Sequence, residues 1–447
     1  MKPRPAARPL PQSQLTAALS NRSVQDGAFA ASIVACRLPA NLGMPGALGC
    51  LLLTGLYVLV RRGQARDALA RGWSQLAYPA FALLSVAWTI YPAVTLRAAV
   101  QMILTAFAGL VLSQAARPRA VLTGLFVAYA TYTLASLLAD NVHPDGHSGA
   151  LALYGMGGEA KNFFADTAGT AFLLAVATMA MGLERRAILA ALSSAGVAVA
   201  CAIATVRAHS AGAVAALGLA GGLLVALLVL RHRSPTLKLV AVLAVLGLLV
   251  LGAVSFQTLL TSIQELSGKD AGLTGRGYLW YRADFIIAER PWLGTGYFGF
   301  WTPGNPDAIG FWRHFNVRQE ATGYSFHNSY IQTLVETGWI GLSIMVACWI
   351  GGTLALMRRF VLTPSLATCF WLSYLALQFS KSPVEPIRPA GLIAPTIMLF
   401  AALGFGCFPV ARRIRSPVSG RGVPEPRFVL PVDGQQGYAF ALPEHHR

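Results

Sequence analysis

The chain has 447 residues, of which 55% are hydrophobic and only 12% are charged. Soluble domains carry about 25% charged residues, so this composition excludes an ordinary soluble protein and predicts an integral membrane protein. The formal net charge of +17 would also suit a nucleic-acid-binding protein. However, Lys and Arg gather in short segments between apolar runs, which is the positive-inside pattern of membrane proteins, so no nucleic-acid partner is expected.

Apolar runs of about 20 residues, long enough to cross a bilayer as helices, recur along most of the chain. Twelve transmembrane helices are predicted, nine within 27–257 and three within 327–410. They lie near residues 27–41, 43–60, 75–91, 97–115, 119–138, 163–183, 187–206, 210–230, 239–257, 327–357, 362–380 and 388–410. The predicted fold class is therefore an all-α membrane protein with about 12 transmembrane helices and one large loop that contains short helices.

Loop charge predicts the orientation of these helices. Most basic residues fall in alternate loops and in the two tails, which places both termini in the cytoplasm. The N-terminal tail is predicted at 1–26, and the polar, Pro- and Gly-rich segment 411–447 is predicted to be a disordered cytoplasmic tail. No cleavable signal peptide is expected, because the first residues lack a compact apolar core. The cytoplasmic loop residues that carry this prediction are Arg61, Arg62, Arg66, Arg71, Arg117, Arg119, Arg185, Arg186, Arg231, Arg233, Lys238, Arg358 and Arg359.

The segment 258–326 is the one large loop, and it falls on the outer face. Within it, 275–290 has the pattern of an amphipathic helix, which Pro291 ends. This helix is expected to rest on the membrane interface. Gly294 and Gly296 follow, and we expect them to form a flexible turn.

Charged side chains at the outer ends of apolar helices are costly, so they are candidate functional residues. Arg97, Lys161, Arg207 and Arg276 have this position, although Arg97 is equally explained by an interfacial residue that reaches the lipid headgroups. His327 opens the tenth span. Behind it, a polar stripe at helical spacing contains Asn328, Gln332 and Glu336, and for Glu336 a structural hydrogen bond is favoured over catalysis.

The chemistry of these side chains points to a phosphate ligand. Guanidinium groups bind phosphate oxygens bidentately and stay charged when buried, so outer-face arginines suit a diphosphate. A neighbouring histidine can act as a general base at neutral pH. The outer segments contain no DxD, HExxH or Walker motif, so no metal and no other cofactor are expected, and an ATP-driven pump is disfavoured.

Several of these segments resemble the bacterial O-antigen ligase and exopolysaccharide polymerase superfamily. The similarity extends over residues 75–345, and its strength lies in the order and spacing of the motifs. The motifs are LSVAWTIYPAVTLRAAVQ (84–101), GGEAKNFFA (157–165), RAHSAGA (207–213), GRGYLW (275–280), ERPWLGTGYF (289–298) and SFHNSYIQTLVETGWIGL (325–342).

The resemblance implies a GT-C-like fold in the bacterial inner membrane, with the large loop in the periplasm. It also implies a metal-independent, inverting glycosyltransferase. The donor would be a glycan linked to undecaprenyl diphosphate. The acceptor would be lipid A-core, as for an O-antigen ligase, and membrane lipids would surround both substrates.

The resemblance also implies roles for the candidate residues. Arg276 and Arg207 would bind the diphosphate, and His327 would be the base or would orient the acceptor. The predicted substrate-binding residues are Lys161, Asn162, Arg97, Asn328, Tyr330 and Trp280.

Two further functions stay open from the sequence. A polymerase that extends lipid-linked repeat units with a growing polysaccharide as acceptor shares the fold, donor and chemistry, and a protein acceptor is a third possibility for the same reaction. A transporter or flippase for the lipid-linked sugar also fits twelve helices. The polar residues gathered on one side favour an enzyme, since alternating access requires polar groups near the midplane.

Overall fold

The structure, a computed structural model, describes residues 21–144, 149–254, 275–317, 324–387 and 390–407. The predicted C-terminal tail at 411–447 lies outside the described residues, as do 1–20 of the N-terminal tail and 258–274 and 318–323 of the predicted loop. The N-terminal tail was predicted to end at residue 26, whereas the first described helix already begins at Arg22.

The first half of the chain forms helices and one small sheet. Its elements are α2 (Arg22–Ala35), η1 (Ala40–Leu42), α3 (Gly43–Val60), α4 (Arg62–Gly72), η2 (Trp73–Leu76), α5 (Ala77–Leu84), η3 (Ser85–Ala87), α6 (Pro92–Ser113), α7 (Pro118–Ala139), β1 (Val142–Pro144), β2 (Leu151–Leu153), α8 (Lys161–Glu184) and α9 (Ile188–Arg207). The two strands are antiparallel, with Val142 opposite Leu153.

The second half contains further helices. They are α10 (Ala211–Leu230), α11 (Pro235–Val254), α13 (Arg276–Glu289), α14 (Pro306–His314), α15 (Ser329–Leu362), α16 (Leu366–Lys381) and α17 (Ala394–Gly406). The helix predicted over 275–290 is α13, with its end one residue before the predicted one.

Seven helices are long and apolar enough to cross a membrane, judged by length and composition. They are the helix over Ala40–Val60 together with α6, α7, α8, α9, α10 and α15. The chain is therefore an all-α, multi-pass membrane protein. Each of the twelve predicted ranges contains a described helix, but α2, α5, α16 and α17 have only 14, 8, 16 and 13 residues. The number of spans stays a prediction.

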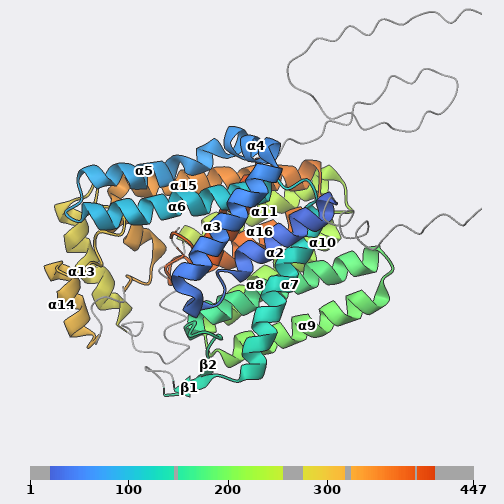
Figure 1. The fold of residues 1–447 in the computed structure, drawn as a ribbon, viewed down its shortest axis with the longest axis horizontal. Coiled ribbons are helices and arrows are strands. Elements are labelled where there is room, and N and C mark those ends of the chain that lie inside the picture. The colour runs from blue at the N-terminus through green and yellow to red at the C-terminus, as the bar shows by residue number, and fades with distance from the viewer. Residues whose placement is uncertain (1–20, 145–148, 255–274, 318–323, 388–389, 408–447) are drawn as a thin grey trace, which may run out of the picture. The chain divides into compact units, whose positions relative to one another are not determined.

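Small residues allow these helices to pack closely. The helix α8 packs against α7, α9 and α16, α2 packs against α7, and α6 packs against α17 (Figure 1). Ala168, Ala171 and Ala175 on α8 are fully buried. A Cβ at Gly182 would lie 2.9 Å from the backbone nitrogen of Ala191 on α9. Within a membrane, such residues let backbones approach and gain van der Waals contact.

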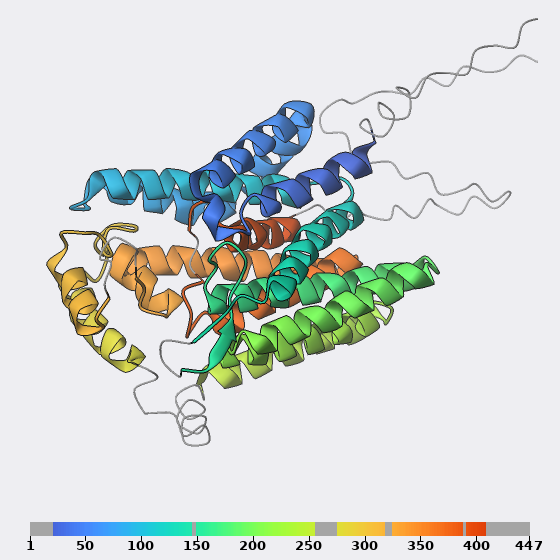
Figure 2. The ribbon, with the colours of Figure 1, turned by 60° about the horizontal axis from the view of Figure 1, so that its bottom comes forward.

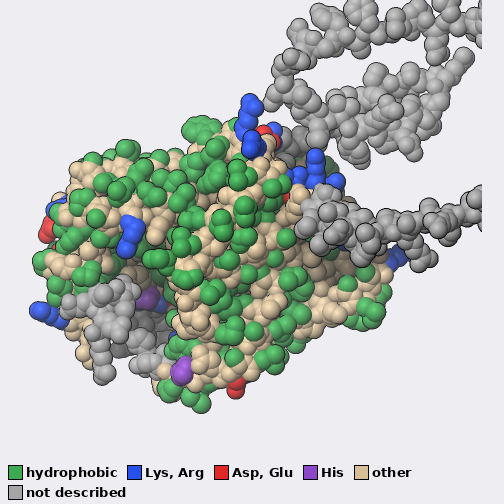
Figure 3. All heavy atoms as spheres, viewed as in Figure 1, with side chains coloured by type: hydrophobic (Ala, Val, Ile, Leu, Met, Phe, Trp, Pro, Cys, Tyr) green, Lys and Arg blue, Asp and Glu red, His purple; other side chains and the backbone are tan. Residues whose placement is uncertain are grey.

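The outer surface of the helices is apolar. Figure 3 shows hydrophobic side chains spread over one face, with few charged side chains among them. Leu52 on α3, Leu189 on α9 and Leu243 on α11 are all more than half exposed. Exposed apolar area of this extent marks a surface that water does not cover, and here lipid would cover it.

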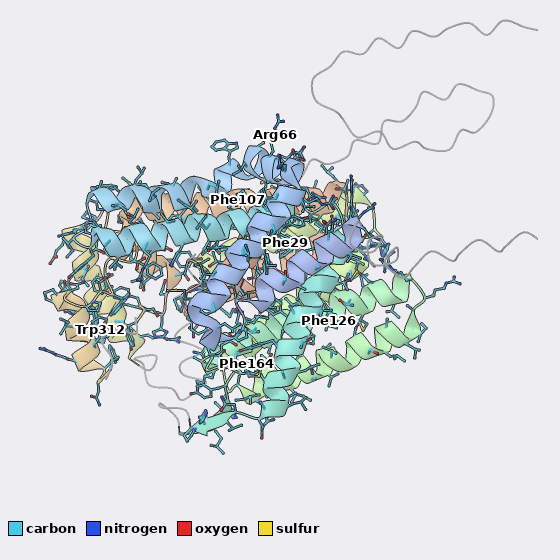
Figure 4. All side chains as sticks on the ribbon, in the orientation of Figure 1. Phe29, Arg66, Phe107, Phe126, Phe164 and Trp312 are labelled. Carbon is cyan, nitrogen blue, oxygen red and sulfur yellow. The ribbon has the colours of Figure 1, made fainter. Side chains whose placement is uncertain are left out.

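The helices α13 and α14 lie together at one end of the longer helices (Figures 1 and 2). Their core is aromatic: Phe300, Phe311, Trp312 and Phe326 are buried against one another and against Leu279. Figure 4 places Trp312 with α13 and α14, apart from Phe164 and Phe126 of the main bundle. The predicted outer loop therefore has a small hydrophobic core of its own.

The loop is joined to the bundle where α15 is broken at Gly338. That residue has φ 64° and ψ −169° inside an otherwise helical segment. The backbone nitrogen of Trp339 donates to the carbonyl of Pro291 at 2.8 Å, and that of Gly296 donates to the carbonyl of Glu336 at 2.8 Å. The loop backbone therefore replaces hydrogen bonds that the break removes from α15.

The glycines at this junction were expected to form a flexible turn, but the structure gives a different reason for them. A Cβ at Gly294 would lie 2.5 Å from the carbonyl carbon of Glu336, and one at Gly296 would lie 2.3 Å from Cβ of Thr89. Both residues also have positive φ, 64° and 99°. The turn is therefore tightly packed, and glycine is needed for close backbone approach.

Candidate active site

One carboxylate joins residues from three distant parts of the chain. Glu385 lies in the segment between α16 and α17. Its Oε1 accepts a hydrogen bond from Nη2 of Arg276 at 3.0 Å and one from Nδ2 of Asn162 at 3.3 Å. Its Oε2 lies 3.8 Å from Nδ1 of His327. Three predicted site residues, Arg276, Asn162 and His327, therefore gather around a residue that was not predicted.

This group, called here the Glu385 cluster, is reachable from solvent. The side chains of Arg276, His327 and Glu385 are 20%, 31% and 23% exposed. A guanidinium has five N–H donors, so a single contact to Glu385 leaves others that can bind phosphate. Nδ1 of His327 is buried and has no hydrogen-bond partner among the described residues.

The backbone around His327 is held in place on both sides. His327 has φ 48°, which is an unusual left-handed conformation for a residue other than glycine. Directly after it, Asn328 caps α15, because its Oδ1 accepts from the backbone nitrogens of Tyr330 and Ile331 at 2.9 and 3.1 Å. Directly before it, the carbonyl of Phe326 accepts from Nε1 of Trp280 at 2.8 Å.

Two predicted substrate-binding residues thus have positions that fix the site's backbone. Asn328 is an N-cap, a role that stabilises the start of a helix, and Trp280 ties α13 to the segment before α15. Tyr330 contacts Ser382 through their hydroxyl groups at 2.9 Å. Whether any of the three also touches a substrate stays a prediction.

The segment that carries Glu385 is anchored to the start of α15. The hydroxyl of Ser329 donates to the carbonyl of Glu385 at 2.9 Å and accepts from the backbone nitrogen of Ile387 at 2.8 Å. The backbone nitrogen of Ser329 also donates to the carbonyl of Ser382 at 2.9 Å. The carboxylate of Glu385 and the imidazole of His327 are therefore held by one set of contacts.

A second polar layer lies beneath the cluster. Asp166, one helical turn after Asn162 on α8, forms an ion pair with Lys381 on α16. It also accepts from Nε2 of Gln378 at 3.0 Å. Residues at i and i+4 share a helix face, so α8 presents Asn162 and Asp166 to the same neighbours. This layer fixes α16 directly before the segment of Glu385.

The charge state of Glu385 follows from its neighbours. Burial raises the pKa of its carboxyl group, but His327 and the guanidinium of Arg276 outweigh that effect. The pKa of Glu385 therefore lies below its ordinary value, and the residue is an anion at neutral pH.

Glu159, next to the start of α8, has the opposite character. Its carboxylate lies 2.8 Å from the hydroxyl of Tyr132 and accepts from the hydroxyl of Thr167 at 3.0 Å. Burial raises its pKa to about 7, against the effect of these two hydrogen bonds. Glu159 is therefore more readily protonated at neutral pH than Glu385, whose carboxylate pairs with Arg276.

Two residues of the polar stripe on α15 face inward. Gln332 and Glu336 are buried, and Nε2 of Gln332 donates to Oε1 of Glu336 at 2.9 Å. Oε1 of Gln332 accepts from Nε1 of Trp301 at 3.1 Å and from the backbone nitrogen of Phe326 at 3.1 Å. The stripe therefore holds the aromatic core of the loop on α15.

The other predicted basic residues lie outside the Glu385 cluster. Arg207, the last residue of α9, pairs with Asp140 at 2.5 Å between Nη2 and Oδ1, and both side chains are exposed. Arg97 on α6 is exposed, and no hydrogen bond or ion pair joins it to any described residue. Lys161 is the partly buried first residue of α8, directly before Asn162.

The exposed part of α13 carries aromatic side chains, of which Tyr278 also stacks on His314 of α14. Tyr278, Tyr281 and Phe285 are each more than a third exposed, and so is Trp292 after the helix end. The guanidinium of Arg282 lies 5.7 Å from the ring of Phe285. Amphipathic aromatic side chains next to cations are typical of the interface between membrane and water.

Glu385 was not predicted, because its signal in the sequence is weak. It lies in the short segment KSPVEPIRP (381–389), which matches no motif. It is 109 residues from Arg276 and 223 from Asn162. The available signal was an acid between Pro383 and Pro386 in a short loop, predicted to be on the outer face, of a charge-poor chain. Among the described residues, no three His, Cys, Asp or Glu side chains gather as a metal site would require.

Comparison with known proteins finds two similarities. Residues 196–346 match the O-antigen ligase family. The chain is also 28% identical to the exopolysaccharide production protein ExoQ of Rhizobium meliloti (strain 1021) over 319 residues, which is 70% of this chain and 72% of the relative. The family match includes Arg207, Arg276 and His327 and ends before Glu385.

Proposed function

We propose that the chain transfers a glycan from undecaprenyl diphosphate to an acceptor sugar, and its similarity to the O-antigen ligase family and to an exopolysaccharide production protein supports this proposal. The reaction takes place on the periplasmic face of the inner membrane, with both termini in the cytoplasm. One observation carries this proposal: Arg276 and His327 meet at a partly exposed carboxylate at one end of the helices.

The proposed reaction inverts the donor sugar. The acceptor oxygen forms a bond to the anomeric carbon while the bond from that carbon to the diphosphate oxygen breaks, and the bonding electrons leave with undecaprenyl diphosphate. His327 accepts the hydroxyl proton or orients the acceptor. Negative charge grows on the leaving group, so a fixed cation binds it more strongly in the transition state than in the ground state. Arg276 has this role, and no metal is required.

The remaining candidates support this site. Lys161 begins α8 beside Asn162, so it can reach a phosphate bound at Arg276. Arg207 can contribute only after it leaves Asp140, and Arg97 is exposed on α6. The aromatic side of α13 rests on the outer leaflet, which brings Arg276, the first residue of α13, to the depth of the lipid diphosphate.

Transfer by the purified protein tests this function. The protein in detergent is given a synthetic polyprenyl-diphosphate glycan and a lipid A-core acceptor, with and without a chelator. We expect a new glycosidic product and release of polyprenyl diphosphate, unchanged by the chelator. A transporter would give no product in detergent and would move the donor only across vesicles. Loss of product with the chelator would contradict the metal-independent mechanism.

The polymerase is the second candidate, because the relative that spans most of the chain is described as an exopolysaccharide production protein. Here the acceptor is another lipid-linked repeat unit, and the chemistry at Arg276 and His327 is the same. Surface glycans of a deletion strain separate the two candidates. Accumulated lipid-linked polymer with no mature lipopolysaccharide indicates a ligase, whereas single repeats without long chains indicate a polymerase.

A further inference from the structure

We propose that Glu385 is the positioning residue of this site: one oxygen of its carboxylate binds Arg276, and the other faces the imidazole of His327. This proposal rests on the proposed function. It concerns the segment between α16 and α17, which lies outside the range that matches the O-antigen ligase family.

The geometry assigns a separate task to each oxygen of Glu385. Oε1 accepts from Nη2 of Arg276 at 3.0 Å and from Asn162 at 3.3 Å, so the guanidinium is turned toward the cluster with its other N–H groups available. Oε2 lies 3.8 Å from Nδ1 of His327. This distance is longer than a hydrogen bond, but the negative charge beside Nδ1 favours the tautomer that carries its proton on Nδ1. Nε2 is then the nitrogen that accepts a proton from the acceptor hydroxyl.

Glu385 is itself held rigidly, as a positioning residue must be. Ser329 binds the backbone of Glu385 and of Ile387 at 2.9 and 2.8 Å. Ser329 is the first residue of α15. It directly follows the helix cap Asn328, and Asn328 directly follows His327. A shift of Glu385 would therefore move the start of α15, and with it the backbone of His327.

Charged and titratable groups face Glu385 from each neighbouring element. Arg276 comes from α13 and His327 from the segment before α15. Lys161 lies beside Asn162 in the first turn of α8, while Asp166 and Lys381 form their own pair below. Arg276 lies 3.0 Å from the carboxylate and His327 lies 3.8 Å from it.

The variant Glu385→Gln tests the proposal, because it keeps the shape of the side chain and removes the charge. We expect kcat for glycan transfer to fall about 10- to 100-fold, the usual loss when a group that orients a reacting residue is removed. KM for the donor should stay the same or fall, because Arg276 loses a competing anion. Glu385→Asp should restore part of kcat. Glu289→Gln, at the exposed end of α13, is the matched control and should behave as wild type.

A second readout does not depend on transfer. Diethyl pyrocarbonate modifies accessible imidazole nitrogens, and mass spectrometry can follow the peptide that contains His327. Loss of the carboxylate should raise the modification rate of His327 several-fold in Glu385→Gln and leave it unchanged in Glu289→Gln.

The outcomes separate this proposal from the proposed function. If the wild-type protein shows no transfer, the proposed function is rejected. If His327 is still modified faster in Glu385→Gln, the contact between Glu385 and His327 is kept. Normal kcat in Glu385→Gln, or a modification rate equal to that of wild type, would overturn the positioning role. A fall in the yield of folded protein with normal kcat per folded molecule would also overturn it, because that is the result of a merely structural residue.

Discussion

Two carboxylates, Asp26 and Glu385, lie at opposite ends of the helices and pair with arginine, yet their surroundings differ. Asp26 on α2 is fully buried and accepts hydrogen bonds from Tyr57 at 2.8 Å, Arg61 at 3.2 Å and the backbone nitrogen of Arg117 at 3.0 Å. Glu385 holds Arg276 but remains partly exposed, and the nearby Nδ1 of His327 has no hydrogen-bond partner.

The comparison distinguishes a structural ion pair from a candidate site. Each oxygen of Asp26 has a protein partner, so no ligand is needed to complete it, and it joins α2, α3 and α7. In the Glu385 cluster, by contrast, Nδ1 of His327 has no hydrogen-bond partner within the described part of the chain, and the side chains are partly exposed to solvent. Perturbed and incompletely paired groups of this kind mark functional sites more often than closed pairs do.

The largest expected effect tests the structural side of the comparison. Asp26→Ala leaves Arg61 buried without its partner, and such a change costs about 3–5 kcal/mol. We expect a marked fall in the thermal unfolding midpoint in detergent, with transfer per folded molecule near wild type. Asp67→Ala, which removes an exposed i,i+4 pair with Arg71, is the control and should change little. An unchanged unfolding midpoint in Asp26→Ala would contradict the assignment of Asp26 as a structural ion pair.

The second prediction tests how the outer cluster is supported. Gly338→Ala would place a Cβ 2.2 Å from the carbonyl carbon of Trp292 at a residue with φ 64°. We expect a loss of about 2–4 kcal/mol from backbone strain and broken loop hydrogen bonds.

Limited proteolysis and transfer activity measure this change. We expect faster cleavage near α13 and reduced transfer in Gly338→Ala. In Gly351→Ala, on the same helix, a Cβ would meet nothing within 4 Å, so that variant should resemble wild type. Equal cleavage of both variants would reject the idea that the break holds the loop.

The smallest expected effect concerns Arg207. Its pair with Asp140 is exposed, and exposed pairs contribute at most about 1 kcal/mol. Asp140→Asn should therefore leave the unfolding midpoint nearly unchanged. If Arg207 binds the donor diphosphate, removal of the competing carboxylate should lower the donor KM. A raised KM would instead show that the pair itself shapes the site.

Local sequence information predicted the helices well and the contacts between them only in part. A helix that crosses lipid satisfies its own backbone, so its position depends on local hydropathy, and each predicted range contains a helix. The amphipathic pattern likewise located α13. The break at Gly338 was not predicted, because it depends on the fit to Trp292 and Leu293 from the loop.

In the candidate site too, single residues were predicted from local sequence, whereas contacts between distant residues were not. Arg276 and His327 were predicted from unusual residue types at outer helix ends, and they lie at one carboxylate. Glu385 was missed and the partner of Arg207 was not foreseen, since both contacts join residues far apart in the chain. Asn328 and Trp280 were predicted as substrate-binding residues, and that stays a prediction; the helix cap and the backbone hydrogen bond that they make were not foreseen.

The most direct test of the account compares glycan transfer by four purified variants. His327→Ala and Arg276→Ala are expected to lose about 10²- to 10³-fold in kcat, the range for removal of a general base or a donor to a growing negative charge. His314→Ala and Arg313→Ala, exposed residues of α14 in the same loop, should retain wild-type transfer. Near-wild-type transfer by Arg276→Ala or His327→Ala, with normal folding, would contradict the assignment of the Glu385 cluster as the active site.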